Sequence, residues 1–154
     1  MSSYLSAIDS IAQIRGGKTT ATELATEALE RIQSIDASGY ELNSVLAISK
    51  SALSDALTID QNLPLAGLPI LIKDNIEAIG LPGTAGSKAL ADFPVKKDAE
   101  LVTRLRAAGA NIIGATNLSE WANIRSTKST SGWSAVGGLT ANPWIHLHSA
   151  GGSS

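Results

Sequence analysis

Several kinds of residue and segment are absent from this 154-residue chain, and each absence excludes a class of protein. There is no cysteine, which rules out disulfides, thiolate zinc sites and cysteine nucleophiles and is compatible with a reducing compartment. The N-terminus has no basic-then-apolar signal segment, and no apolar run is long enough to cross a bilayer. We therefore expect a soluble, cytoplasmic protein with no membrane partner.

A strong charge of one sign is also missing. The formal net charge is -2, and the lysines and arginines are scattered along the chain. Because this leaves no basic stripe, nucleic acid is not expected as a partner. The composition, 44% hydrophobic and 17% charged over 154 residues, fits one globular domain with a sizeable core.

Apolar periodicity predicts helices alternating with short strands. Helical spacing over 5–14 ends at a pair of glycines, and a second helix over 20–35 begins at a capping box of Thr20 and Glu23. A third helix is expected over 50–59, with Ala52, Leu53, Ala56 and Leu57 facing inward. Strands are expected over 43–48, 67–72 and 111–114. This alternation predicts an α/β fold.

Two further helix starts are read from capping patterns. Asp98 precedes a periodic apolar segment that ends at Gly109, so a helix capped by Asp98 is expected. Asn117, with Glu120 three residues later, predicts another helix by the same logic.

Lys73 and Asp74 directly follow the apolar strand predicted over 67–72. Burial among apolar side chains disfavours the charged form of a lysine, so a neutral amine able to accept a proton is expected at Lys73. From this stretch alone, an ordinary surface ion pair between Lys73 and Asp74 is the more common explanation.

Two stretches rich in small residues are predicted to be loops. The glycines of 80–87 do not follow a phosphate-binding spacing, so a nucleotide loop is not expected. The stretch 126–138 is dense in hydroxyls and glycines. A loop of this kind either lies exposed on the surface or lines a site, where small residues let a substrate approach the backbone closely. Ser129, Ser131 and Gly132 are the substrate-lining candidates in it.

Five motifs occur in the order and spacing of one known family. They are the segment ending in Lys73-Asp74-Asn75, then Gly83-Thr84-Ala85-Gly86-Ser87, the helix and strand over 98–114, Thr116-Asn117-Leu118-Ser119-Glu120-Trp121, and Gly151-Gly152-Ser153-Ser154. Over essentially its whole length the chain resembles the amidase signature family. The block that starts at Asn117, followed by Ser129-Thr130-Ser131-Gly132-Trp133-Ser134, is similar to the peptide-amidase branch. The A subunits of amidotransferases usually carry a different block there.

The resemblance implies a fold and a chemistry. The chain would form the N-terminal part of a single amidase signature domain, a mixed sheet covered by helices, with an N-terminal helical segment over 1–62 and the start of the catalytic core over 63–154. Family members hydrolyse amides with a Ser, cis-Ser and Lys triad and need no cofactor. Lys73 corresponds to the lysine and Ser153 to the bridging serine, with Gly152 and Ser154 beside it as further lining candidates. The family's nucleophile and oxyanion donors fall after Ser154.

Three functional readings therefore stay open. The first is an amidase acting on a small amide or a peptide C-terminal amide, with residues 1–154 alone inactive. The second is a truncated α/β fragment that acts only through association, including self-association at unpaired sheet edges near Ile70 and Ile112. The third is an amidase similar to the A subunits of amidotransferases. His146 and His148 have no third ligand motif, so no metal site is expected.

Overall fold

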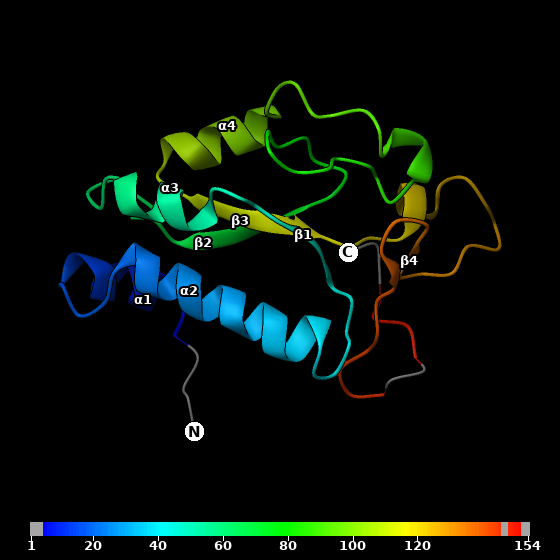
Figure 1. Ribbon diagram of the computed structural model, residues 1–154, viewed down its shortest axis with the longest axis horizontal. Coiled ribbons are helices and arrows are strands. Elements are labelled where there is room, and N and C mark those ends of the chain that lie inside the picture. The colour runs from blue at the N-terminus through cyan, green and yellow to red at the C-terminus, as the bar shows by residue number, and fades with distance from the viewer. Residues whose placement is uncertain (1–4, 146–147, 152–154) are drawn as a thin grey trace.

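The computed structural model describes residues 5–145 and 148–151 and has a mixed α/β architecture. A three-stranded sheet lies between helices on both of its faces (Figure 1). Helices α1 (Ala7–Arg15), α2 (Ala21–Arg31) and α3 (Ala52–Thr58) precede helix α4 (Glu100–Ala107) in the chain. The predicted fold class is confirmed. None of the helices in the described residues is long and apolar enough to cross a membrane.

The N-terminal helices follow their sequence signals closely. Ser6 caps α1, which ends at Gly16, as the glycine pair indicated. Thr20 and Glu23 form the predicted capping box of α2, with each side chain bonded to the other's backbone amide at 3.1 and 2.8 Å. The helix continues as a π-helical turn, η1 (Ile32–Ala37), so the helical run ends where the apolar face ends.

The capping box makes the stability of α2 depend on pH. The backbone amide of Thr20, and then the hydroxyls of Thr19 and Thr20, lower the pKa of Glu23 below its usual 4.5. A lowered pKa gives stability that is present above pH 4.5 and is lost as pH falls through the folded value. We expect Glu23→Gln to reduce the loss of stability between pH 7 and pH 3, measured by urea unfolding. Glu30→Gln, beyond the first turn of the same helix, is the control and should leave that loss unchanged.

The sheet places one strand between two others. Strands β1 (Val45–Ile48) and β2 (Pro69–Lys73) flank β3 (Asn111–Thr116), with β1 antiparallel and β2 parallel to it. The predicted unpaired edge near Ile112 is therefore wrong, because β1 folds back onto the far side of β3. Within the described residues β2 pairs only with β3, so the edge near Ile70 is present.

Each face of the sheet has its own core. On one face Ile113 packs with alanines of α2 and α3, and on the other Ile72 and Ile112 pack with Val102 of α4. Ala52 and Ala56 face inward as predicted, but Leu53 and Leu57 are 43% and 74% exposed, so their predicted burial is wrong. Small alanines allow α3 to lie close against the sheet, and the side-chain amide of Asn111 bonds the carbonyl of Ala52 at 3.0 Å.

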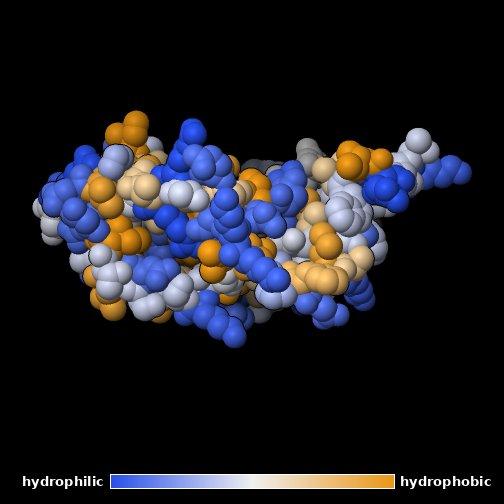
Figure 2. Space-filling model, turned by 90° about the horizontal axis from the view of Figure 1, so that it is seen from above, coloured by the Kyte–Doolittle hydropathy of each residue, from blue (hydrophilic) through white to orange (hydrophobic). Residues whose placement is uncertain are grey.

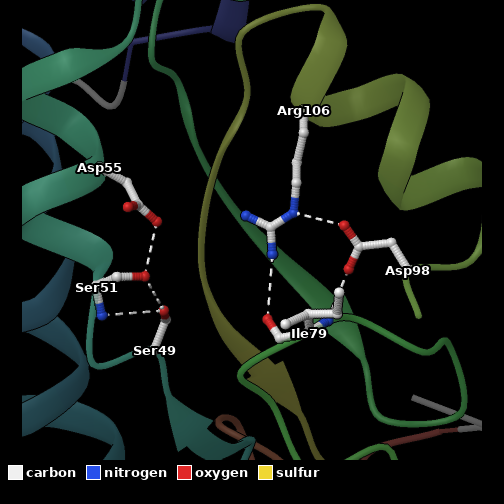
Figure 3. A network of polar contacts seen from close by, with 6 residues as sticks. All are labelled: Ser49, Ser51, Asp55, Ile79, Asp98 and Arg106. Carbon is white, nitrogen blue, oxygen red and sulfur yellow. Dashed lines mark hydrogen bonds and ion pairs between the residues drawn. The ribbon is translucent and has the colours of Figure 1, made fainter. Parts of the chain in front are cut away.

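Asp98 does not cap α4. The N-cap is Ala99, and Asp98 instead accepts hydrogen bonds from the backbone of Ile79 at 2.7 Å and from Arg106 at 3.0 Å (Figure 3). Arg106 also donates to the carbonyl of Ile79 at 3.3 Å. The carboxylate thus ties the loop before α4 to the last turn of that helix, while Gly109 ends it with φ +84° as expected.

The segment after β3 contains little regular structure. It consists of a 3₁₀ turn, η3 (Glu120–Asn123), and the short hairpin β4 (Trp133–Ser134) and β5 (Gly138–Leu139), while another 3₁₀ turn, η2 (Lys88–Leu90), lies earlier in the chain. The helix predicted from Asn117 is absent, because the Asn117 side chain bonds distant residues rather than capping a turn. Seen from the α4 side, hydrophobic groups are separated by hydrophilic ones (Figure 2). The division of the chain at residue 62 stays a prediction.

Candidate active site

Lys73 is the last residue of β2, as the sequence predicted. It is half-buried, and its Cα is paired with Thr116, the last residue of β3. Since β2 and β3 are parallel, the loops that follow them start at the same edge of the sheet. In open α/β sheets this carboxyl edge is where ligands commonly bind.

Asp74 is not a surface residue. It is 1% exposed, and its carboxylate accepts hydrogen bonds from the amide of Gly83 at 2.9 Å, the amide of Thr84 at 3.0 Å and the hydroxyl of Thr84. The alternative of an ordinary Lys73–Asp74 surface pair is therefore wrong. The sequence analysis did not predict that Asp74 holds the loop that follows it. The available signal was an acidic residue followed by a loop of small residues, whose backbone amides can donate to a carboxylate.

The loop 80–87 packs against the segment after β3. The carbonyl of Ala85 accepts from the amide of Trp121 at 2.9 Å, and that of Gly86 accepts from Val136 at 3.3 Å. Gly86 has φ +78°, and a Cβ added there would lie 2.8 Å from the Ser134 Cβ, so only glycine fits. Asp74 thereby holds a loop that contacts the hairpin region.

Asn117 connects three parts of this edge. Its side-chain amide donates to the carbonyls of Asn43 at 3.2 Å and Gly138 at 3.1 Å, and its oxygen accepts from the Ser134 hydroxyl at 2.7 Å. It is 2% exposed. A buried amide with several partners fixes the hairpin relative to the start of β1, because each lost bond would leave a buried polar group unpaired.

A pocket of about 370 Å³ opens in the segment after β3. Its walls combine two tryptophans, two cations, one carboxylate and several small polar residues: Glu120, Trp121, Asn123, Arg125, Ser126, Lys128, Ser129, Thr130 and Trp133. This volume lies within the range of roughly 300 to 1,000 Å³ typical of small-molecule sites. The hydroxyl-rich stretch 126–138 was the sequence signal for one part of this wall, whereas no motif indicated the part formed by Glu120, Trp121 and Asn123.

Three consecutive pocket-side residues have left-handed backbones. Trp121, Ala122 and Asn123 have φ of 51°, 52° and 66°, and none is a glycine. Such conformations cost on the order of 1–3 kcal/mol each and cluster at functional sites. The carbonyl of Ala85 and the hydroxyl of Ser131 support this turn by accepting hydrogen bonds from Trp121 and Asn123.

The substrate-lining candidates occupy different positions. Ser129 lines the pocket. Ser131 and Gly132 instead hold its wall: Ser131 accepts from Asn123 at 3.0 Å, and the amide of Gly132 donates to the buried Ser119 hydroxyl at 2.8 Å. Lys73 is not a lining residue of this pocket.

The remaining candidates lie at the end of the chain. Gly152, Ser153 and Ser154 are outside the described residues, as is His146, and His148 is exposed. In the part of the chain that the structure describes, no three His, Cys, Asp or Glu side chains gather in a metal-binding group.

Comparisons with known proteins agree on one family. The family model described as Amidase matches residues 23–154. The A subunit of the glutamyl-tRNA(Gln) amidotransferase from Lacticaseibacillus paracasei is 40% identical over 148 residues, which are 92% of this chain and 29% of that protein. The native peptide amidase of Stenotrophomonas maltophilia is 42% identical with a TM-score of 0.93, over 98% of this chain and 32% of that one. The peptide amidase PAM, solved with the competitive inhibitor chymostatin, is 44% identical with a TM-score of 0.88, over 92% of this chain and 30% of that one. The chain thus spans about a third of the length of these relatives.

Proposed function

The chain belongs to the amidase family, and on that premise we propose that it forms the N-terminal part of an amide-bond hydrolase with Lys73 as its general base. The observation that carries the proposal is the place of Lys73 at the carboxyl end of β2, in a fold that superposes on a peptide amidase with a TM-score of 0.93. The division into a helical segment over 1–62 and the start of a catalytic core over 63–154 is part of this proposal.

The proposed chemistry is a proton relay. The Lys73 amine takes the proton of the Ser153 hydroxyl, and Ser153 takes the proton of a nucleophilic serine as that serine attacks the amide carbonyl. Return of the protons releases the amine and leaves an acyl-enzyme, which water then hydrolyses. The nucleophile belongs to sequence that follows the Gly151-Gly152-Ser153-Ser154 motif in the family. Residues 1–154 alone therefore supply the base and the bridging serine only.

The proposed substrate is a small amide or a peptide C-terminal amide. Likeness to two peptide amidase structures supports this choice, as does a pocket of about 370 Å³ in the segment that follows β3. Ser129 lines this pocket, and Ser131 and Gly132 hold its wall. Gly152 and Ser154, outside the described residues, stay proposed as substrate-lining residues.

A second candidate follows from the curated relatives. Several of them are A subunits of glutamyl-tRNA(Gln) amidotransferases at about 40% identity. Under this reading the protein works as one component of a larger assembly. Association alone, through the edge of β2 or with a second copy, is the third candidate and stays a prediction.

Joining residues 1–154 to the downstream two thirds of the Stenotrophomonas maltophilia peptide amidase tests the first candidate. We expect this chimera to release ammonia from a peptide amide and residues 1–154 alone to give no turnover above background, since a nucleophile is required. Ammonia release, followed enzymatically, is the measurement. A folded chimera without activity would favour the assembly-component or association reading. Turnover by residues 1–154 alone would show a nucleophile inside them.

A further inference from the structure

We propose that the pocket lined by Glu120, Trp121, Arg125, Lys128 and Trp133 is a specificity subsite that binds an aromatic side chain of the amide substrate with an acidic residue beside it. This inference rests on the proposed amidase function and adds the substrate class. The lining combines flat aromatic surface with two cations.

The aromatic preference follows from the two tryptophans. Trp121 is half-buried and Trp133 is 44% exposed, so both present ring surface to a ligand. Stacking and edge contacts between aromatic groups add about 0.5–1.5 kcal/mol to the burial of their area. The aliphatic stems of Arg125 and Lys128 extend this apolar surface, while their charged ends reach water.

The charge preference follows from an imbalance at the rim. Arg125 and Lys128 are exposed cations, whereas Glu120 is the one acidic residue among the described residues that line the pocket. One oxygen of Glu120 accepts a hydrogen bond from the amide of Ala135 at 3.1 Å, which turns that carboxylate toward the hairpin. A negative group next to the bound aromatic ring is therefore favoured over a positive one.

The pocket is held in shape before any ligand binds. Asn123 donates to Ser131 at 3.0 Å, the amide of Lys128 donates to Ser126 at 3.0 Å, and the Ser129 hydroxyl donates to the carbonyl of Ser126 at 3.0 Å. A preformed wall lowers the ordering cost of binding. The left-handed backbone of residues 121–123 is the conformational cost of presenting Trp121 and Asn123 on the same wall.

The pocket also belongs to the segment that follows β3, the strand parallel to β2. Its first lining residue, Glu120, is four positions after Thr116, the partner of Lys73 in the sheet. The amide of Trp121 bonds the carbonyl of Ala85 at 2.9 Å, in the loop that Asp74 holds. In this proposal the rest of the bound substrate lies toward the edge where Lys73 ends β2.

The test is an NMR titration of the 154-residue chain with three peptides. They are N-acetyl-glutamyl-phenylalaninamide, N-acetyl-glutamyl-alaninamide and N-acetyl-lysyl-phenylalaninamide. We expect the first to bind with shifts in the Trp121 and Trp133 indole signals, and the alanine peptide to bind at least about tenfold more weakly, because it lacks the ring. The lysyl peptide should bind about three- to tenfold more weakly at low salt, a difference that shrinks as salt is added.

Matched variants show which residues cause the preferences for phenylalanine and for glutamate. Trp133→Ala should remove the preference for phenylalanine, whereas Trp144→Ala, at a 92% exposed tryptophan outside the pocket, should retain it. Replacing Arg125 and Lys128 by alanine should remove the preference for glutamate, and the same change at the exposed Lys96 and Lys97 should not.

The outcomes separate this inference from the proposed function. Equal affinity for the three peptides, or no binding, overturns the subsite even where the chimera is active. Selective binding with an inactive chimera supports the subsite and counts against the hydrolase. If Trp133→Ala does not fold, the relative affinities of the three peptides for the unaltered chain still test the subsite.

Discussion

Replacing Lys73 by arginine in the active chimera is expected to lower kcat for amide hydrolysis by a factor of about 10⁴ or more, as removal of a base from a catalytic unit does. Arginine keeps the positive charge and much of the length, but its guanidinium does not release its proton in a protein. Lys73→Ala should lose activity to the same extent. The measurement is kcat for peptide-amide hydrolysis in both variants between pH 6 and pH 10.

Urea unfolding separates this loss of activity from a loss of fold. Lys73 is a half-buried residue at the end of a strand, so both variants should remain folded at 25 °C. Lys96→Ala in the same chimera is the control, since this exposed lysine lies neither on β2 nor among the residues that line the pocket, and it should keep kcat. If Lys73→Arg kept most of the wild-type rate, Lys73 would act as a fixed positive charge, and the general-base role would be wrong.

The second large effect is expected at Asp74. Asp74→Ala removes the acceptor of the backbone amides of Gly83, Thr84 and Gly86 and of the Thr84 hydroxyl, at a residue that is 1% exposed. Leaving buried donors unpaired costs about 1–3 kcal/mol for each group, so we expect the free energy of unfolding to fall by about 3 kcal/mol or more. Urea unfolding of the 154-residue chain, followed by far-UV circular dichroism, measures this change.

Two further variants grade the effect. Thr84→Val removes the hydroxyl that donates to the Asp74 carboxylate, while the backbone amide of residue 84 still donates to it. This change should lower the free energy of unfolding by about 1 kcal/mol. Asp92→Ala, at an exposed aspartate, should change the free energy of unfolding by less than about 0.5 kcal/mol. An Asp74→Ala protein as stable as the Asp92→Ala protein would mean that the loop 80–87 does not depend on this carboxylate.

The sequence by itself was sufficient to predict structural elements that depend on interactions between residues close together in the chain. The capping box of Thr20 and Glu23, the glycine stop of α1 and the apolar strand that ends at Lys73 all formed as predicted. Each depends on side-chain spacing within one helical turn or one strand. The five motifs in family order likewise identify the family from the sequence alone, because motif order is a property of the sequence itself.

Contacts between distant residues were decided only by the tertiary structure. Asp98 and Asn117 both fit a capping pattern, yet Asp98 bonds Ile79, and Asn117 bonds Gly138. A capping side chain and a loop-holding side chain carry the same acceptor atoms, so local spacing cannot tell which donor will be nearest. The central position of β3 depends on β1 returning to pair with it. The pocket between Trp121 and Trp133 is formed by one segment after β3, and the backbone bonds that join this segment to the loop 80–87 exist only in the folded chain.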